Sequence, residues 1–280
     1  MRTAPAWRLI AVLLAAVMSP ATQAADAPPL RTVQRGFAKP DAIRTALQDL
    51  VDTCREGRQL PAAPATMPSP AVMARTPQIE VETLFDGERW AEYTTTAQFV
   101  PDPKSCETTV WRTFSAKVRD GCATEVQGSS GAGLGLVEPP PKPWVRESAA
   151  RCASGQPRPA PVLTGLPTQD AGHGERCVWT SDITARATGG GRAAGFDTCV
   201  SVRRPSVLTA AGRREVVLRT RLDPKTADGA SLLHPMPLVE ELQLAEYSEG
   251  GGALPAERFS RRGVEAFVAQ AARLPIGGRP

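Results

Sequence analysis

Two short segments carry the fold prediction: Gly-Glu-Arg-Cys-Val-Trp at residues 174–179 and Phe-Asp-Thr-Cys-Val-Ser-Val at residues 196–202. Both are rich in β-branched and aromatic residues, and the three glycines at 189–191 between them indicate a turn. Further strand patterns cover Glu215–Leu222 and Val239–Tyr247. Together these segments predict a meander of antiparallel strands.

Cysteine usage predicts covalent cross-links. The chain has six cysteines, an even number, and an even count in an exported protein is typical of disulfides. All six are candidates: Cys54, Cys106, Cys122, Cys152, Cys177 and Cys199. Folding the segment about residues 188–190 brings Cys177 and Cys199 together, so this is the favoured pair. Cys106 and Cys122 are not opposite each other in the expected strand register. Because no two cysteines have Cys-x-x-Cys spacing, neither a metal site nor a catalytic thiol is expected.

The first residues have the pattern of a secretory signal. Arg2 and Arg8 precede the apolar run Leu9–Met18, and Thr22-Gln23-Ala24 places small residues at a cleavage site. The run is too short to span a bilayer, which takes about 20 residues. We therefore expect a signal peptide at residues 1–24, a periplasmic protein, and no stable membrane insertion after cleavage.

Residues 25–77 are expected to form an arm, a helix and a linker. Ala25–Pro40 has the pattern of an extended, weakly ordered arm. Asp41–Arg55 is expected to be an amphipathic helix with Asp41 as its N-cap, because apolar residues recur at helical spacing. Leu60–Pro77 contains five prolines and is expected to be an exposed linker. Cys54 lies on the apolar stripe of the helix, so its oxidation would tie the helix to the body.

Residues 78–274 are expected to form a β-rich domain that begins with a hairpin. Ile79–Phe85 alternates, Asp86-Gly87 is a turn signal, and the returning strand covers Glu88–Val100. A two-residue turn would place Thr83 opposite Trp90. The face expected to be buried holds Ile79, Val81, Phe85 and Trp90, and the face expected to be wet holds Glu80, Glu82, Arg89 and Tyr93.

The same domain is expected to contain a second strand pair and a closing helix. The strands are Glu107–Val118 and Cys122–Val126, around Asp120-Gly121. Arg262–Leu274 has the apolar stripe of a C-terminal helix packed on the sheet. Residues 275–280 are expected to be a disordered tail.

The candidate chemistry is sparse. Gly128–Gly135 is rich in glycine but lacks the Gly-Lys-Ser/Thr ending of a phosphate loop, so a flexible loop is expected. His173 and His234 each lie in a loop pattern, and a hydrolase would need an unfamiliar site built on these histidines or Ser129. No catalytic residues, cofactor or metal ion are therefore predicted.

Charge argues against a nucleic-acid partner. The formal net charge is +4, and about +2 remains without Arg2 and Arg8. The densest basic cluster is expected to be solvent-facing arginines on strands, and it consists of Arg203, Arg204, Arg213, Arg214, Arg219 and Arg221.

A secretory signal, an early amphipathic helix, long antiparallel strands and the tail Leu254-Pro255-x-x-x-Phe259 resemble the periplasmic lipoprotein-carrier (half-barrel) superfamily. The resemblance covers Ile79–Phe259. It implies an α+β fold with a curved antiparallel sheet, one helix near each end of the chain, and a concave face for an acyl chain or another apolar ligand. The proline-rich linkers and six cysteines depart from the carriers, which places lipoprotein trafficking itself in doubt.

Three functional hypotheses follow. The first is a non-enzymatic periplasmic protein that binds an apolar ligand, a lipoprotein acyl chain or an envelope partner. The second is a disulfide-stabilised envelope assembly or protein-interaction factor, which would use the proline-rich segments Leu60–Pro77 and Gly128–Pro143. The third is the hydrolase described above.

Overall fold

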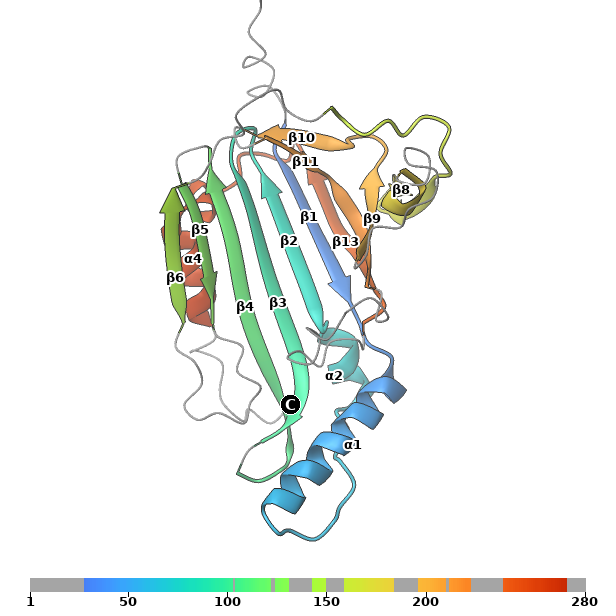
Figure 1. Cartoon of the computed structure of the whole chain (residues 1–280), viewed down its shortest axis with the longest axis vertical. Helices are drawn as coiled ribbons and strands as arrows, with labels where there is room; N and C mark the ends of the chain where they lie inside the picture. Colours follow the sequence, from blue (N-terminus) through green and yellow to red (C-terminus); the bar gives the residue numbers. More distant parts are fainter. Residues whose placement is uncertain are drawn as a thin grey trace, which may run out of the picture.

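One curved, open antiparallel sheet organises the chain (Figure 1). The computed structural model describes residues 28–102, 104–121, 124–130, 143–149, 159–183, 196–209, 212–222 and 239–270. Within these residues eleven strands pair in the order β6-β5-β4-β3-β2-β1-β13-β12-β9-β8-β7, and β10 and β11 form a separate hairpin. The predicted α+β class with a curved antiparallel sheet is confirmed. The expected signal peptide, Cys122, Cys152, His234 and the C-terminal tail lie outside the described residues.

The elements have the following bounds. The strands are β1 Leu30–Gly36, β2 Ile79–Phe85, β3 Trp90–Pro101, β4 Thr108–Asp120, β5 Thr124–Ser129, β6 Trp144–Ala149, β7 Gln169–Gly172, β8 Glu175–Trp179, β9 Phe196–Ser201, β10 Ser206–Thr209, β11 Gly212–Glu215, β12 Val217–Leu222 and β13 Glu241–Glu249. The helices are α1 Pro40–Gly57, α2 Pro70–Arg75, the 3-10 helix η3 Ala256–Phe259, and α4 Arg261–Val268.

The segment expected to be a weakly ordered arm contains a central strand. β1 pairs with β2 on one side and with β13 on the other. The prediction failed because Arg31 and Arg35 interrupt the apolar pattern of Leu30–Gly36. Both arginines are neutralised in the fold: Arg31 pairs with Glu82 at 2.7 Å, and Arg35 pairs with Glu80 at 2.6 Å. Carboxylates on the neighbouring strand thus allow a charged segment to lie in the middle of the sheet.

The β2–β3 hairpin forms as predicted, but with a shifted register. Phe85, not Thr83, lies opposite Trp90. Four residues connect the strands because the Asp86 carboxylate accepts a hydrogen bond from the Arg89 backbone N–H at 2.9 Å. A shift of two residues keeps every side chain on its predicted face.

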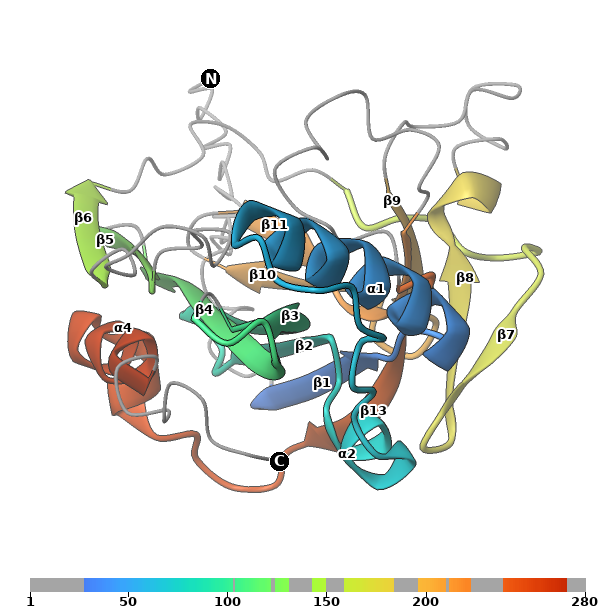
Figure 2. The same cartoon turned by 90° about the horizontal axis from the view of Figure 1, so that it is seen from below.

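The face of this hairpin that was expected to be wet is partly buried. Tyr93 is 2 % exposed and packs in a cluster with Phe259, Val264 and Val268. The predicted C-terminal helix supplies this cover: it forms as α4 over Arg261–Val268, and Phe267 contacts Tyr93 edge to face at 4.8 Å. Figure 2 shows α4 on the convex side of the sheet.

The predicted N-terminal helix is confirmed as α1, although Lys39 rather than Asp41 is its N-cap. Ile43, Leu47 and Val51 are buried. They pack in a cluster that includes Ile79 and Leu242 of the sheet. Cys54 forms a disulfide with Cys106, so the expected covalent tie between helix and body is present.

The linker after α1 is more structured than expected. Residues 70–75 form the short helix α2, capped by the Ser69 hydroxyl. Ala65, Met67, Val72 and Met73 pack against the cluster that holds α1. The expectation of a fully exposed linker is therefore wrong for these residues.

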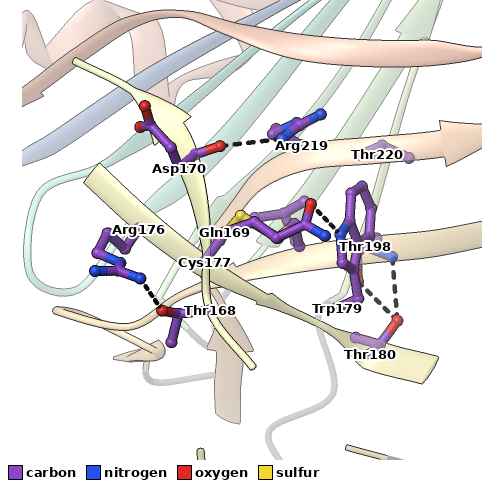
Figure 3. Close-up of a disulfide and its surroundings, with 12 residues drawn as sticks. Thr168, Gln169, Asp170, Arg176, Cys177, Trp179, Thr180, Thr198, Arg219 and Thr220 are labelled. Carbon is purple, nitrogen blue, oxygen red and sulfur yellow. Dashed lines mark hydrogen bonds between the residues drawn. A yellow bond between two sulfur atoms is a disulfide. The ribbon is translucent and has the colours of Figure 1, made fainter. Parts of the chain in front are cut away.

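The segment that led the fold prediction pairs as expected. β8 and β9 are adjacent, and Trp179 lies opposite Cys199. The favoured Cys177–Cys199 disulfide forms, with Cα atoms 5.3 Å apart. Figure 3 shows its surroundings, where the Trp179 Nε1–H donates to Gln169 at 2.9 Å.

The predicted strand Glu215–Leu222 is in fact two strands. β11 ends at Glu215, β12 begins at Val217, and the intervening Val216 is 5 % exposed. The Val216 backbone N–H donates to Pro205, and its carbonyl accepts from the Ser201 N–H. These bonds turn the chain from the β10–β11 hairpin into the main sheet. The predicted strand pair Glu107–Val118 and Cys122–Val126 corresponds to β4 and β5, with Val118 opposite Val126.

Candidate ligand pocket

A pocket of about 1010 Å³ lies on the concave face of the sheet. Strands β1, β2 and β3 form its floor, and the β10–β11 hairpin crosses one end (Figure 1). The helix α1 lies across the other end, where Ile79 and Leu242 belong both to the pocket wall and to the cluster beneath the helix. This volume is in the range of small-molecule sites.

Strand alternation explains why one face of the sheet lines the pocket. Leu30, Thr32 and Gln34 of β1 point into it, whereas Arg31 and Arg35 lie on the opposite face with their glutamate partners. Most of the apolar lining comes from β1, β2, β3, β13 and the segment 207–217. These residues are Leu30, Ile79, Val81, Phe85, Trp90, Val207, Val216, Val217 and Leu242.

A polar strip lies on the β1 and β12 side of the floor. The Gln34 side chain is 4 % exposed and donates to the Val217 carbonyl at 3.1 Å. The Thr220 hydroxyl donates to Gln34 Oε1 at 3.0 Å. These bonds engage both the nitrogen and the oxygen of the amide, so Gln34 links β1 to β12.

A charged end lies on the β3 and β4 side of the pocket. Glu92, Arg119 and Arg214 all line it. The Arg214 guanidinium lies over the Trp90 ring, with Cζ 3.6 Å from the ring centroid. Arg119 is paired with Glu125, which also accepts a hydrogen bond from Gln127 at 2.6 Å and lies 3.4 Å from Lys117 Nζ.

Burial and neighbouring charges shift the pKa values of the titratable groups at and beside this charged end. Burial raises the pKa of the Glu92 carboxyl, against the opposing charges of Arg214 and Lys117. Burial also lowers the pKa of Arg214, and the positive charge of Arg119 adds to this effect. Burial of Glu125 acts to raise its pKa, but the hydrogen bonds from Arg119 and Gln127 leave that pKa below its ordinary value.

Ser129 and His173, the described residues on which a hydrolase site was considered, are not brought together. Ser129 lies on β5, near one edge of the sheet, and His173 lies in the turn between β7 and β8 at the opposite edge. His234 is outside the described residues. Gly128 and Ser129, expected to begin a flexible loop, instead belong to β5.

The arginine cluster is less exposed than expected. The side chains of Arg204 and Arg219 are 12 % and 19 % exposed, and they pair with Glu249 and Glu241 respectively. Arg203 pairs with Glu175 and Glu249. Arg221 lies over Trp179, 3.9 Å from the ring centroid. The prediction of solvent-facing arginines is therefore wrong for Arg204 and Arg219, because carboxylates on neighbouring strands contact them, whereas Arg203 and Arg221 are exposed as predicted.

The residue patterns did not predict a pocket lined by these side chains. Their alternation was visible for Ile79, Val81, Phe85 and Trp90, which were expected to share a buried face. Nothing local indicated that Arg214 would contact Trp90, because the two residues belong to segments far apart in the chain. No group of His, Cys, Asp or Glu side chains in the described ranges could hold a metal ion. No helix among the described residues is long and apolar enough to cross a membrane.

Comparison with protein-family models, curated proteins and solved structures finds no match to this chain. The two disulfides of the described residues fit a protein that folds in an oxidising environment.

Proposed function

We propose that the protein is a non-enzymatic periplasmic binding protein that holds an apolar ligand, such as an acyl chain, on the concave face of its sheet. The observation that carries the proposal is the pocket of about 1010 Å³ between the sheet, the β10–β11 hairpin and α1. Apolar side chains dominate the β1, β2 and β13 part of its wall. Burying apolar ligand surface there is favourable by about 25 cal/mol per Å².

The half-barrel resemblance also supports this proposal. It implies a concave face that accepts an acyl chain, and the pocket lies on the concave face of the present sheet. Periplasmic location rests on the signal pattern at residues 1–24 and on the two disulfides.

The test is native mass spectrometry of the mature protein purified from periplasm, followed by organic extraction of bound molecules. We expect a co-purifying lipid or other apolar molecule. The variant Val81→Trp fills the pocket floor and should reduce the ligand-bound fraction. Leu60→Trp is the matched control, because Leu60 is 40 % exposed and is not part of the pocket wall.

A ligand-free protein that also fails to bind a fluorescent fatty acid, cis-parinaric acid, would contradict the proposal. Equal amounts of retained ligand in Val81→Trp and Leu60→Trp would contradict it as well.

A further inference from the structure

The pocket wall is divided into an apolar part and a charged part. The apolar side chains are on β1, β2, β13 and the segment that contains Val207 and Val216. The charged residues that line the pocket are Glu92 on β3, Arg119 on β4, and Arg213, Arg214 and Glu215 on β11. A ligand that fills both parts would place its apolar portion over the apolar side chains and a charged or polar group at the charged end.

Arg214 is the cation at this end for which the described residues supply no hydrogen-bond acceptor. Within the described residues its guanidinium makes a cation–π contact with Trp90 but no hydrogen bond or ion pair. A guanidinium has five N–H donors arranged to bind carboxylate or phosphate oxygens. Because Arg214 is half-buried beside the pocket, a ligand oxygen can satisfy these donors.

The neighbouring charges favour a negative ligand group. Arg119 and Lys117 share Glu125, whereas Glu92 is the carboxylate whose charge acts most strongly on Arg214. Among the ranges that the structure describes, no ion pair or hydrogen bond reaches the Glu92 carboxylate. Burial also favours the protonated form of this group, since its pKa is raised. Among the described residues, no ion pair with Glu92 therefore occupies the Arg214 guanidinium.

We propose that the pocket binds a single-chain amphiphile with an anionic head group, the head lying against Arg214 and the alkyl chain extending over β2 and β1 toward Leu242. This inference rests on the proposed function and specifies its ligand class. A fatty acid carboxylate and a monoalkyl phosphate share the required chemistry.

The experiment is isothermal titration calorimetry of the mature protein with four dodecyl compounds below their micelle concentrations. These are dodecanoate, dodecyl phosphate, dodecanol and dodecyltrimethylammonium, which carry almost the same alkyl chain and differ in the head group. We expect the two anions to bind at least about tenfold more tightly than the alcohol and the cation, as hydrogen bonds to a charged group allow. The stronger of the two anions identifies carboxylate or phosphate as the preferred head.

Variants of Arg214 separate head-group binding from a structural role. Arg214→Gln should remove the preference for the anions while changing dodecanol affinity by less than about twofold, since the alkyl contacts remain. Arg214→Lys should keep part of the preference. Arg112→Gln is the matched control, because Arg112 is an exposed arginine on β4 that does not line the pocket.

The outcomes are distinguishable. Equal affinity for all four compounds would overturn the head-group inference and leave apolar binding intact. Tighter binding of the cation, or an equal loss of dodecanol and dodecanoate affinity in Arg214→Gln, would overturn it as well. Absence of binding for every compound would overturn both the inference and the proposed function.

Discussion

Cys54, in the last turns of α1, is joined by a disulfide to Cys106, in the turn between β3 and β4, with their Cα atoms 5.9 Å apart. The bond fixes the helix that lies across one end of the concave face to the longest hairpin of the sheet. Cys106 has a φ of 57° and is 3 % exposed, so the turn places the sulfur inward at the cost of an uncommon backbone conformation. The position of α1 thus depends on a covalent link as well as on its apolar stripe.

Removing this disulfide should destabilise the protein. The bond closes a loop with a sequence separation of 52, and the chain-entropy estimate for such a loop is about 4 kcal/mol. We expect the double variant C54A/C106A to lose about that free energy of unfolding in urea titrations under non-reducing conditions. Amide hydrogen exchange should accelerate in α1 more than in β12. Unchanged exchange in α1 would show that packing alone holds the helix.

Glu92 should make stability depend on pH. Because burial raises its folded-state pKa above the unfolded value of about 4.3, the folded state binds the proton more tightly. Its contribution to stability is therefore full below the unfolded pKa and is lost as pH rises through the folded pKa. Glu92→Gln should be more stable than the wild type at pH 7, and the difference should shrink near pH 4.

Thermal unfolding of the wild type and Glu92→Gln at several pH values measures this difference. Glu88→Gln is the control, since Glu88 is exposed in the β2–β3 connection. A wild-type protein that gains stability relative to Glu92→Gln as pH rises from 4 to 7 would contradict the prediction.

Gly128 should not tolerate a side chain. A Cβ at this position on β5 would lie 2.6 Å from Val264 Cγ1 of α4 and 3.2 Å from the Trp144 carbonyl oxygen. Gly128→Ala should therefore cost about 1–3 kcal/mol, the usual range for overpacking. Gly57→Ala is the matched control, because a Cβ at that position meets nothing within 4 Å. Chemical denaturation of both variants checks the difference, and equal stability would mean that α4 shifts without cost.

Phe259 should be essential for the packing of η3 and α4 against the convex face of the sheet. It is 1 % exposed, packs in the cluster with Tyr93 and Val264, and has the Arg89 guanidinium over its ring at 4.8 Å. Phe259→Ala should cost about 3–5 kcal/mol of unfolding free energy. Phe37→Ala, in which a phenylalanine that is 47 % exposed is truncated, should have a much smaller effect. Comparable losses in the two variants would contradict the packing argument.

Local patterns were sufficient for several elements. Ile43, Leu47 and Val51 recur at helical spacing and are the buried residues of α1. Cys177 and Cys199 were paired correctly because they lie on two recognisable strand patterns that follow one another in the sequence. The residues that share each face of the β2–β3 hairpin were predicted correctly in spite of the register error, since a shift of two residues preserves strand alternation.

Long-range contacts explain the failures. Tyr93 was assigned to a wet face because its neighbours on that face are charged, yet α4 covers it. The strand β1 was missed because its arginines are neutralised by Glu82, Glu80 and Glu246 from β2 and β13. Arg214 reaches Trp90 only because the β10–β11 hairpin folds across the sheet. None of these partners can be read from the residues next to them in the chain.

The sequence by itself determined the α+β class, the amphipathic helix, most strands and the Cys177–Cys199 pair, because helical period, strand alternation and turn residues are local properties. Only the tertiary structure decided that Leu30–Gly36 lies at the centre of the sheet, that α4 buries Tyr93, and that Arg214 and Glu92 both line one end of a pocket. The physical reason is that burial and charge compensation depend on which distant segments pair. Those pairings are set by the free energy of the whole fold rather than by any one segment.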